Sequence, residues 1–292
     1  MIEHPFKQGT AEWQDARRGV ITASRAKDVR RTDGLTAQQR VYVKALRDGY
    51  CEADAKAAAG YKAKPTAALV EQAISGTLTL QFGEAAHTYA KELARERCGG
   101  KDPEGFQGLS QRVGHEEEPF AAIAYIGKTG AELEEAFFIT TDDCKFGMSL
   151  DRWVIPGRKA ALEIKTMVSS STLFDAMVDG DISPYRDQCL FGLWMLTPDW
   201  IDLCLWCPDL QALKVIRIER DEEELQALED DLMAFEALVC GYETALLAAL
   251  GRTPTPESID RDHALTSMEL KPATVRPYVP AVAAEAITDP FA

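Results

Sequence analysis

The sequence contains no long uninterrupted apolar run. Its longest apolar stretch, around residues 237–250, is broken by Glu243 and falls short of the roughly 20 apolar residues that a transmembrane helix needs. The first ten residues, MIEHPFKQGT, have neither the basic region nor the apolar region of a secretory signal. We therefore expect no membrane partner and a location in the cytoplasm.

Cysteine is sparse and scattered through the chain. The seven cysteines are an odd number, which suits reduced thiols in a reducing compartment rather than a disulfide framework. Cys204 and Cys207 form a C-x-x-C pair, but an iron–sulfur cluster requires four grouped cysteines, and the other five are not grouped with them. We therefore expect neither an iron–sulfur cluster nor a zinc site.

Positive charge is in short supply. The chain carries 32 Lys and Arg against 47 Asp and Glu, a formal net charge of −15, which argues against a protein that coats nucleic acid by bulk attraction. The net charge does not exclude an enzyme that acts on nucleic acid, because such an enzyme needs only a local positive path. Carboxylates that hold metal ions would also make its total charge more negative. With 46% hydrophobic and 27% charged residues, the composition is that of a globular protein.

One segment departs from the acidic average. Residues 17–31 contain six basic side chains against Asp28 alone, a net charge of +5, and are the best local candidate for a phosphate contact. Residues 20–24 (VITAS) favour a short strand, and Ser24 is a candidate N-cap for a helix over residues 25–31. The alternative interpretation is a solvated basic helix face.

Residues 36–76 are Ala-rich and helical in pattern. Gly49, Gly60 and Gly76 follow three successive stretches, as C-cap glycines do. Three short helices in this arrangement resemble the helix-turn-helix at the start of phage small terminase subunits, and a small helical insertion with no role in DNA binding is the alternative. We assign residues 1–250 to a main domain and residues 32–80 to an insertion within it. A Pro-bearing tail, residues 251–292, follows the main domain.

The rest of the main domain alternates between strand and helix patterns. We predict strands over residues 136–140, 146–155, 160–167, 200–207 and 212–218, and helices over residues 87–98, 116–126, 184–196 and 221–250. Helices, a mixed sheet, one helix, two more strands and a closing helix indicate an α/β (α+β) fold with a central mixed sheet flanked by helices.

The candidate for chemistry lies in the run FGMSLDRWVIPGRKAALEIKTMV, residues 146–168. In a strand, Glu163 and Lys165 share one face, and a preceding strand that turns back through the Pro-Gly pair would bring Asp151 beside them. Two carboxylates close together are unfavourable unless a cation neutralises them. A divalent cation such as Mg²⁺ takes carboxylate ligands and assists the hydrolysis of phosphodiesters.

The same run resembles the core of the PD-(D/E)xK nuclease superfamily, and its surroundings resemble the phage lambda exonuclease family, the YqaJ-type viral recombinases. Residues 8–24 fit the opening signature Q-G-x(3)-W-x(3)-R-x-G-V-I-T-A-S, and residues 93–100 fit the helix L-x-x-E-x-x-x-G. Residues 114–119 (GHEEEP) fit a G-x-x-x-E helix start, and residues 219–222 resemble a segment after the last strand. The chain departs at Leu150, which replaces the proline of the usual S-P-D. The resemblance covers neither the insertion nor the tail.

The resemblance implies a restriction-endonuclease-like core with a metal site. Asp151 and Glu163 would bind Mg²⁺, with the carbonyl of Ile164 nearby and Mn²⁺ as a substitute metal. Lys165 would assist the attacking water and balance charge in the transition state.

Further site residues are assigned from helices. Glu118 would be an additional metal ligand, or a base close to the metal. If the orientation of the helix differs by one residue from the one expected, Glu116 or Glu117 would take the place of Glu118. Gln188 and Tyr185, three residues apart on one helix face, would line the active site. The plainer alternatives are that Gln188 satisfies backbone groups and that Tyr185 belongs to the core.

For the DNA end, the resemblance implies that Arg17, Ser24 and Ser149 surround the 5′-terminal phosphate. A guanidinium with two hydroxyls suits a terminal phosphate, and Arg17 and Ser24 lie in the basic segment described above. From that segment we add Arg18 and Arg25 as candidate DNA contacts.

The resemblance makes residues 1–250 a Mg²⁺-dependent exonuclease domain. It would degrade one strand of double-stranded DNA in the 5′-to-3′ direction from 5′-phosphorylated ends and leave 3′ overhangs for homologous recombination. The implied partners are DNA ends, a single-strand annealing protein and further copies of the chain in a homotrimeric ring, in the bacterial host cytoplasm if a phage encodes the chain. Two alternatives stay open: an endonuclease or nickase with the same core, and a non-catalytic DNA-binding or packaging protein that uses the helices of residues 36–76.

Overall fold

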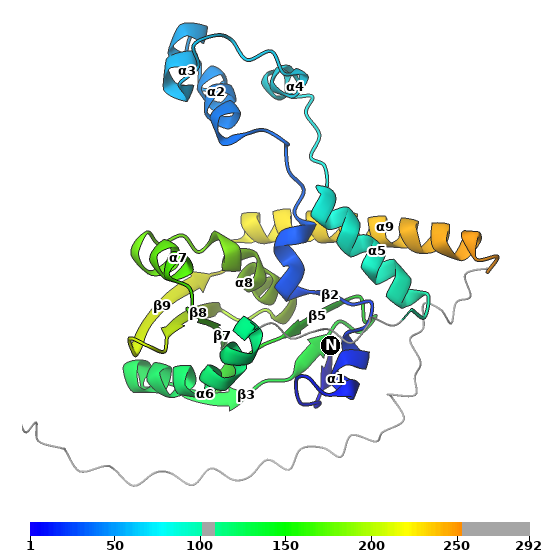
Figure 1. The fold of residues 1–292 in the computed structure, drawn as a ribbon, viewed down its shortest axis with the longest axis vertical. Helices are drawn as coiled ribbons and strands as arrows, with labels where there is room; N and C mark the ends of the chain where they lie inside the picture. The colour runs from blue at the N-terminus through cyan, green and yellow to red at the C-terminus, as the bar shows by residue number, and fades with distance from the viewer. Residues whose placement is uncertain (101–108, 253–292) are drawn as a thin grey trace, which may run out of the picture.

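The structure is a computed structural model that describes residues 1–100 and 109–252, and its strands form two sheets (Figure 1). The four-stranded sheet has the order β1-β4-β5-β2, with the bounds Ile2–His4, Phe138–Thr140, Phe146–Ser149 and Ile21–Thr22. The five-stranded sheet has the order β3-β6-β7-β8-β9, with the bounds Glu132–Glu135, Arg152–Ile155, Ala160–Thr166, Trp200–Cys207 and Ala212–Glu219. Both sheets are mixed, because β2 pairs with β5 and β7 with β8 in parallel while the other pairs are antiparallel.

Helices cover both faces of the five-stranded sheet. The helices of the body are α1 (Ala11–Arg17), the 3-10 helix η1 (Ala23–Val29), α5 (Glu84–Arg97), α6 (Leu109–Thr129), α7 (Ser170–Leu173), the π-helical turn η2 (Phe174–Val178), α8 (Ser183–Leu196) and α9 (Glu222–Ala249). Leu162 and Ile164 of β7 pack with α6, whereas Ala161 of the same strand packs with α8. The alternation of side chains along β7 therefore turns Glu163 and Lys165 towards α8.

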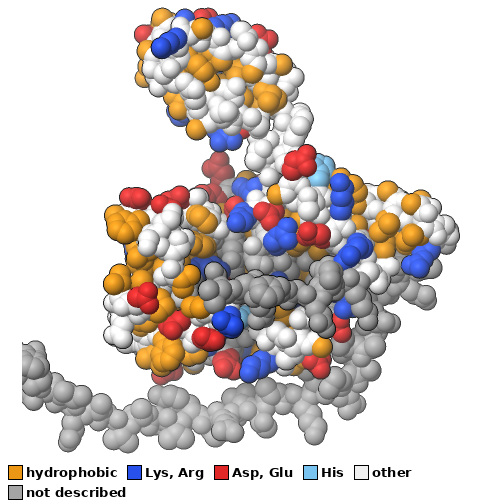
Figure 2. All heavy atoms as spheres, in the orientation of Figure 1, with side chains coloured by type: hydrophobic (Ala, Val, Ile, Leu, Met, Phe, Trp, Pro, Cys, Tyr) orange, Lys and Arg blue, Asp and Glu red, His pale blue; other side chains and the backbone are white. Residues whose placement is uncertain are grey.

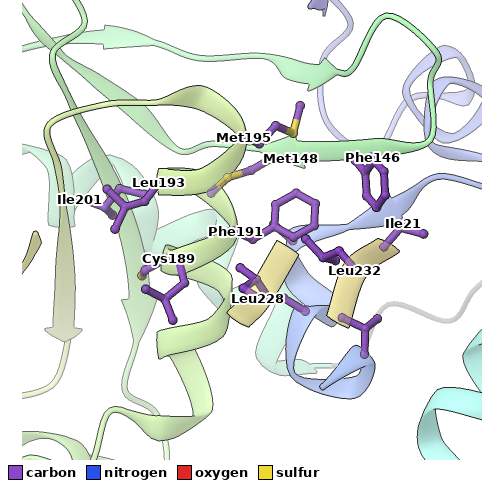
Figure 3. Packing of buried hydrophobic residues seen from close by; sticks show 14 of the residues in the cluster. Ile21, Phe146, Met148, Cys189, Phe191, Leu193, Met195, Ile201, Leu228 and Leu232 are labelled. Carbon is purple, nitrogen blue, oxygen red and sulfur yellow. The ribbon is translucent and has the colours of Figure 1, made fainter. Parts of the chain in front are cut away.

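The main core surrounds α8 (Figure 3). Phe191 of α8, Met148 of β5, Ile201 of β8 and Leu232 of α9 are all fully buried in it. Close approach depends on Gly192, since a Cβ there would lie 2.7 Å from Cδ1 of Ile201 and 2.9 Å from Sδ of Met148. This packing joins the two sheets into one body.

The prediction of one strand over residues 146–155 is wrong, because the structure contains two strands there. β5 ends at Ser149 and belongs to the four-stranded sheet, whereas β6 begins at Arg152 and belongs to the other. Between them, Leu150 is buried in the main core. The chain therefore crosses from one sheet to the other at Leu150 and Asp151, so one central sheet becomes two.

Other predicted bounds shift for local reasons. The helix predicted over residues 25–31 is the 3-10 helix η1, and its N-cap is Thr22 rather than Ser24, because β2 ends after two residues. The helix predicted over residues 116–126 extends over the whole of α6, through Pro119. β3, α7 and η2 have no counterpart in the predicted elements.

Several local predictions are confirmed. Gly60 and Gly76 are left-handed C-caps, with φ of 71° and 76°, and Gly49 follows the C-cap of its helix with φ of 89°. β8 has the predicted bounds, and α9 begins after the N-cap Asp221, whose carboxylate accepts bonds from two backbone amides. The mixed α/β fold flanked by helices is also confirmed.

The predicted insertion forms a small helical module that stands apart from the body (Figure 1). It contains α2 (Ala37–Arg47), α3 (Glu52–Ala59) and α4 (Ala68–Ser75) around a core of its own, in which Tyr42 and Val70 are fully buried. At its base, Thr32 and Gln81 exchange backbone hydrogen bonds of 2.8 and 2.9 Å. The module therefore leaves and re-enters the body at one point.

Within the described residues, α9 is the one helix long and apolar enough to cross a membrane by length and composition. Leu228, Leu232 and Phe235 on this helix are buried in the main core. Asp231 and Glu236 are buried on it as well, and both are paired with cations. The first half of α9 therefore packs into the core of the body.

Candidate active site

Asp151 and Glu163 are brought together by the β6-β7 hairpin. The register pairs Arg152 with Leu162, so the preceding residue, Asp151, lies beside Glu163. Oδ2 of Asp151 also accepts a hydrogen bond of 2.6 Å from the backbone amide of Ile164. Three of the predicted residues thus share one end of the hairpin, where the chain leaves the four-stranded sheet.

Glu163 is the most buried of these acidic groups, with 2% of its surface exposed. Its Oε1 accepts hydrogen bonds from Nζ of Lys165 at 2.7 Å and from Nε2 of Gln188 at 2.5 Å. Its Oε2 is buried and has no hydrogen-bond partner in the part of the chain that the structure describes. An unpaired buried carboxylate oxygen is costly, which makes this atom the clearest sign of a cation at the site.

Burial and the neighbouring charges shift the pKa values of Asp151 and Lys165. Burial is the main cause that raises the pKa of Asp151 well above its usual range, and the neighbouring charge of Glu163 adds to it. Burial opposes the charged form of Lys165, but Glu163 and Asp151 outweigh burial and raise the pKa of Lys165. The lysine is therefore a protonated counter-ion at neutral pH.

The helix phase of α6 selects Glu118 from the acidic triplet. Glu118 forms an ion pair with Arg152, and its charge contributes to the raised pKa of Asp151. Glu117 instead accepts a hydrogen bond of 3.1 Å from the indole of Trp206, and Glu116 is exposed. Of the three candidates, Glu118 is thus the one that lies at the acidic pair.

α8 contributes the two predicted side chains on the opposite side of Glu163. Gln188 donates directly to its carboxylate, so the amide does more than satisfy backbone groups. Tyr185 is half-buried, and burial raises its pKa while the charge of Lys165 lowers it. Tyr185 thus lies near the ammonium of Lys165 rather than wholly in the core.

Arg17 lies under the same end of β5. Its Nη1 donates a 3.3 Å hydrogen bond to Oγ of Ser149, and its guanidinium lies 4.4 Å from the ring centroid of Trp13 and 5.4 Å from that of Phe138. Burial lowers the pKa of Arg17, and it forms no ion pair with any described carboxylate. A partly buried guanidinium without an anion is suited to bind one.

Ser24 completes this group of predicted residues. β2 and β5 run in parallel with Thr22 beside Gly147, so Ser24, two residues after β2, and Ser149, the last residue of β5, lie towards the same end of neighbouring strands. The Ser24 side chain is exposed, and its hydroxyl lies 3.3 Å from that of Thr22.

Arg18 and Arg25, the two further candidates for DNA contacts, are engaged by carboxylates of the protein. Arg18 pairs with Asp15, and Arg25 pairs with Asp28 at 2.5 Å and with Glu92 at 3.3 Å while its guanidinium stacks on the ring of Tyr89. Arg30 and Arg31 pair with Asp231 as well, so among the described residues Arg17 and Lys27 are the two basic side chains of this segment without an ion pair.

Sequence reasoning missed the residues that hold the Arg17 segment in place. Glu96 of α5 accepts from the backbone amide of Gly19, and Nε of Arg97 donates to the carbonyl of Gly19 at 2.9 Å. Arg97 also forms a bidentate ion pair with the buried Glu236 at 2.9 and 2.7 Å. The E-R pair in the L-x-x-E-x-x-x-G helix was the available signal, but its target lies far away in the sequence.

The acidic residues fit a hard divalent cation. Among the described residues, no three His, Cys, Asp or Glu side chains form a ready-made metal site, and Glu118 is engaged by Arg152. Asp151 and Glu163 nevertheless supply two carboxylates and one unsatisfied buried oxygen. Oxygen ligands of this type suit Mg²⁺ and Mn²⁺.

Two comparisons with known proteins show a similarity, one of sequence and one of fold. Residues 12–197 match the YqaJ-like viral recombinase domain. The structure is similar to the crystal structure of an alkaline exonuclease, LHK-Exo, from Laribacter hongkongensis, with 23% identity, a TM-score of 0.57, and coverage of 83% of this chain and 98% of that one. A structure of LHK-Exo in complex with dAMP gives 22% identity, a TM-score of 0.56 and the same coverage. A search of curated proteins gives no match.

Proposed function

The chain belongs to the YqaJ-like viral recombinase domain family, and on that premise we propose that it is a Mg²⁺-dependent 5′-to-3′ exonuclease. Its substrate is double-stranded DNA with a 5′-phosphorylated end. The products are 5′-mononucleotides and a 3′ single-stranded overhang, which homologous recombination by strand annealing would use.

One observation carries this proposal. Ser149 accepts a hydrogen bond from Arg17, which has no ion pair among the described residues, and stands two residues before Asp151, which lies beside Glu163. A phosphate group bound at Arg17 would therefore be linked to the acidic pair through a single short piece of chain. An enzyme that removes nucleotides from an end needs this combination: one group to hold the terminal phosphate and a cation site at the next phosphodiester.

Asp151 and Glu163 would hold the cation, with Glu118 as the further carboxylate. A bound Mg²⁺ supplies Lewis-acid stabilisation of the charge that develops on the phosphate oxygens. Lys165 keeps its proton, because the neighbouring carboxylates raise its pKa, and so donates a hydrogen bond from Nζ that orients the attacking water. Gln188 holds Oε1 of Glu163 in place, which leaves Oε2 directed to the cation.

Recognition of the DNA end is assigned to Arg17, Ser149 and Ser24. The guanidinium is held between two aromatic rings, so little side-chain entropy is lost when it binds a phosphate. The two hydroxyls can each donate one hydrogen bond to the phosphate oxygens. A 5′-hydroxyl end lacks the charge that this pocket would compensate.

We also propose the assembly and partners that the resemblance implies. A homotrimeric ring around the duplex would keep the enzyme on DNA between cleavage steps, because a topological link survives the loss of individual contacts. A single-strand annealing protein would take up the 3′ overhang. Both processes would occur in the cytoplasm of the host cell.

The test is digestion of linear duplex DNA that carries a 5′-phosphate on one end or on neither, with Mg²⁺ or with EDTA. We expect Mg²⁺-dependent loss of the phosphorylated strand from its 5′ end, and no digestion by Asp151→Ala or Lys165→Ala. Covalently closed plasmid is the control substrate. Cutting of the plasmid would indicate an endonuclease instead, and intact linear DNA under all conditions would rule out nuclease function.

A further inference from the structure

Asp151, Glu163 and Glu118 form an acidic cluster, and Arg152 is a cation inside it. The proposed chemistry does not use this arginine. It follows Asp151 directly, and its Nη1 donates both to the Glu118 carboxylate and to the backbone carbonyl of Asp151, the latter at 2.5 Å. Only 19% of each side chain of the Arg152 and Glu118 pair is exposed. One nitrogen atom therefore ties the α6 carboxylate to the backbone of the principal metal-ligand candidate.

This ion pair changes how many carboxylates the site offers. Glu163 has an unpaired oxygen and Asp151 lies beside it, whereas Glu118 is occupied by the guanidinium. Because Arg152 and Lys165 both lie in the cluster, two positive charges already balance part of the three negative ones. A divalent cation that recruits Glu118 must first displace Arg152 from it.

We propose that Arg152 is an intramolecular counter-ion that competes with the divalent cation for Glu118 and thereby sets the affinity of the site for metal. This inference rests on the proposed function, since it requires a cation at Asp151 and Glu163. Arg152 acts through Glu118 and is a positioning residue. When the cation binds, the guanidinium releases Glu118 but stays beside the site, where its charge is available to a DNA phosphate.

The surroundings of Arg152 favour this role over a purely structural one. β6 and β7 are already paired through backbone bonds at this position, so the hairpin does not need the ion pair. Arg158 provides the comparison, because it lies in the turn at the other end of the hairpin, where it pairs with Glu134 at 2.6 Å and Glu3 at 3.5 Å. Neither of these carboxylates belongs to the acidic cluster.

The test measures Mn²⁺ binding to the full chain by calorimetry, without DNA, in wild type, Arg152→Gln, Glu118→Gln and the double variant. Release of Glu118 in Arg152→Gln should lower the dissociation constant by about threefold to fivefold, the range that a partly exposed ion pair can supply. In the Glu118→Gln background, Arg152→Gln should have no such effect, because no carboxylate is left to release. Arg158→Gln is the matched control and should bind Mn²⁺ as the wild type does.

Each other outcome overturns the inference. Tighter binding on removal of Arg152 in both backgrounds would mean that its charge acts through space and not through Glu118. Unchanged or weaker binding in Arg152→Gln, with normal binding in the wild type, would remove the competition while leaving the proposed nuclease site intact. Absence of Mn²⁺ binding in every variant would overturn both proposals. Arg152→Met, which keeps the apolar stem, repeats the measurement if Arg152→Gln does not fold, as judged by circular dichroism.

Discussion

Asp151 and Glu163 are acidic side chains held close enough to repel each other. Folding places Glu163 under α8 and Asp151 at the crossing between the two sheets, and neither can move away from the other. Lys165 offsets part of this repulsion. The remainder is a cost that the protein carries whenever no cation is bound.

The first prediction at this scale concerns pH and Asp151. Burial and Glu163 raise the pKa of this carboxyl in the folded state. Between its pKa in the unfolded state and its pKa in the folded state, the folded protein therefore binds more protons than the unfolded protein. In this pH range the free energy of unfolding falls as pH rises. Asp151→Asn removes that loss. Without divalent cations, we expect this variant to be more stable than the wild type at pH 7 by about 1 kcal/mol or more.

Urea unfolding with EDTA at a series of pH values measures this difference. The advantage of Asp151→Asn should shrink as pH falls to about 4, where the unfolded carboxyl also takes up its proton. Saturating Mg²⁺ should reverse the order of stability, because a cation that binds only the folded wild type stabilises it alone. A variant that is less stable than the wild type at pH 7 in EDTA would contradict the assigned repulsion.

The strand β5 carries Ser149 and leads directly into Asp151. Gly147 is buried in it, and a Cβ there would lie 2.6 Å from Cζ of Phe138 and 2.9 Å from Cγ1 of Val20. Phe138 in turn covers the guanidinium of Arg17. Packing at this glycine thus positions both the strand and the arginine that is proposed to bind phosphate.

Gly147→Ala is the prediction at the scale of the element. The added methyl group must displace the ring of Phe138, so we expect a loss of about 1–3 kcal/mol in the free energy of unfolding. The displaced ring should also weaken the preference for 5′-phosphorylated over 5′-hydroxyl ends. Urea unfolding and the ratio of digestion rates on the two substrates measure the two effects.

Gly127→Ala in α6 is the control for this substitution. Nothing lies within 4 Å of a Cβ at that position, and alanine is the better helix former, so stability should stay the same or rise by up to about 1 kcal/mol. If Gly147→Ala behaves in the same way, the close approach to Phe138 plays no part in stability.

At the scale of the whole molecule, the helical module, residues 32–80, has two interpretations: a DNA-binding element or an insertion without a role in DNA binding. Of the six basic side chains in residues 33–80, three form ion pairs within the module: Arg40 with Asp33 at 2.8 Å, Lys44 with Asp48 at 2.7 Å and Lys56 with Glu52 at 3.7 Å. Figure 2 shows side chains of both signs on its surface and no concentration of positive charge on the face in view. These observations favour an insertion without a DNA role over the helix-turn-helix alternative.

Deletion of the module tests that view. Thr32 and Gln81 pair as antiparallel neighbours, so an Asn-Gly turn can replace residues 33–80. We expect the shortened chain to melt cooperatively and to digest linear duplex DNA at a rate close to that of the full chain. Retained folding with loss of DNA affinity, measured by fluorescence anisotropy, would instead assign the module to DNA binding.

Much of the site could be predicted from the sequence because its parts lie within single elements. The alternation along β7 puts Glu163 and Lys165 on one face, and the Pro-Gly turn predicts the return that brings Asp151 close. The spacing of Tyr185 and Gln188 likewise follows from one helix. The engagement of Arg18 and Arg25 by nearby carboxylates could not be read from charge counting alone.

By itself, the sequence determined most of the helices and strands, the C-cap glycines of the insertion, and the acidic pair with its lysine, since each depends on neighbours within a few residues. Only the tertiary structure decided that the chain crosses between two sheets at Asp151, that Arg152 holds Glu118, and that Arg17 pairs with no carboxylate of residues 1–100 and 109–252. These features arise from contacts between segments far apart in the chain. Their energies depend on packing and burial, which no local pattern records.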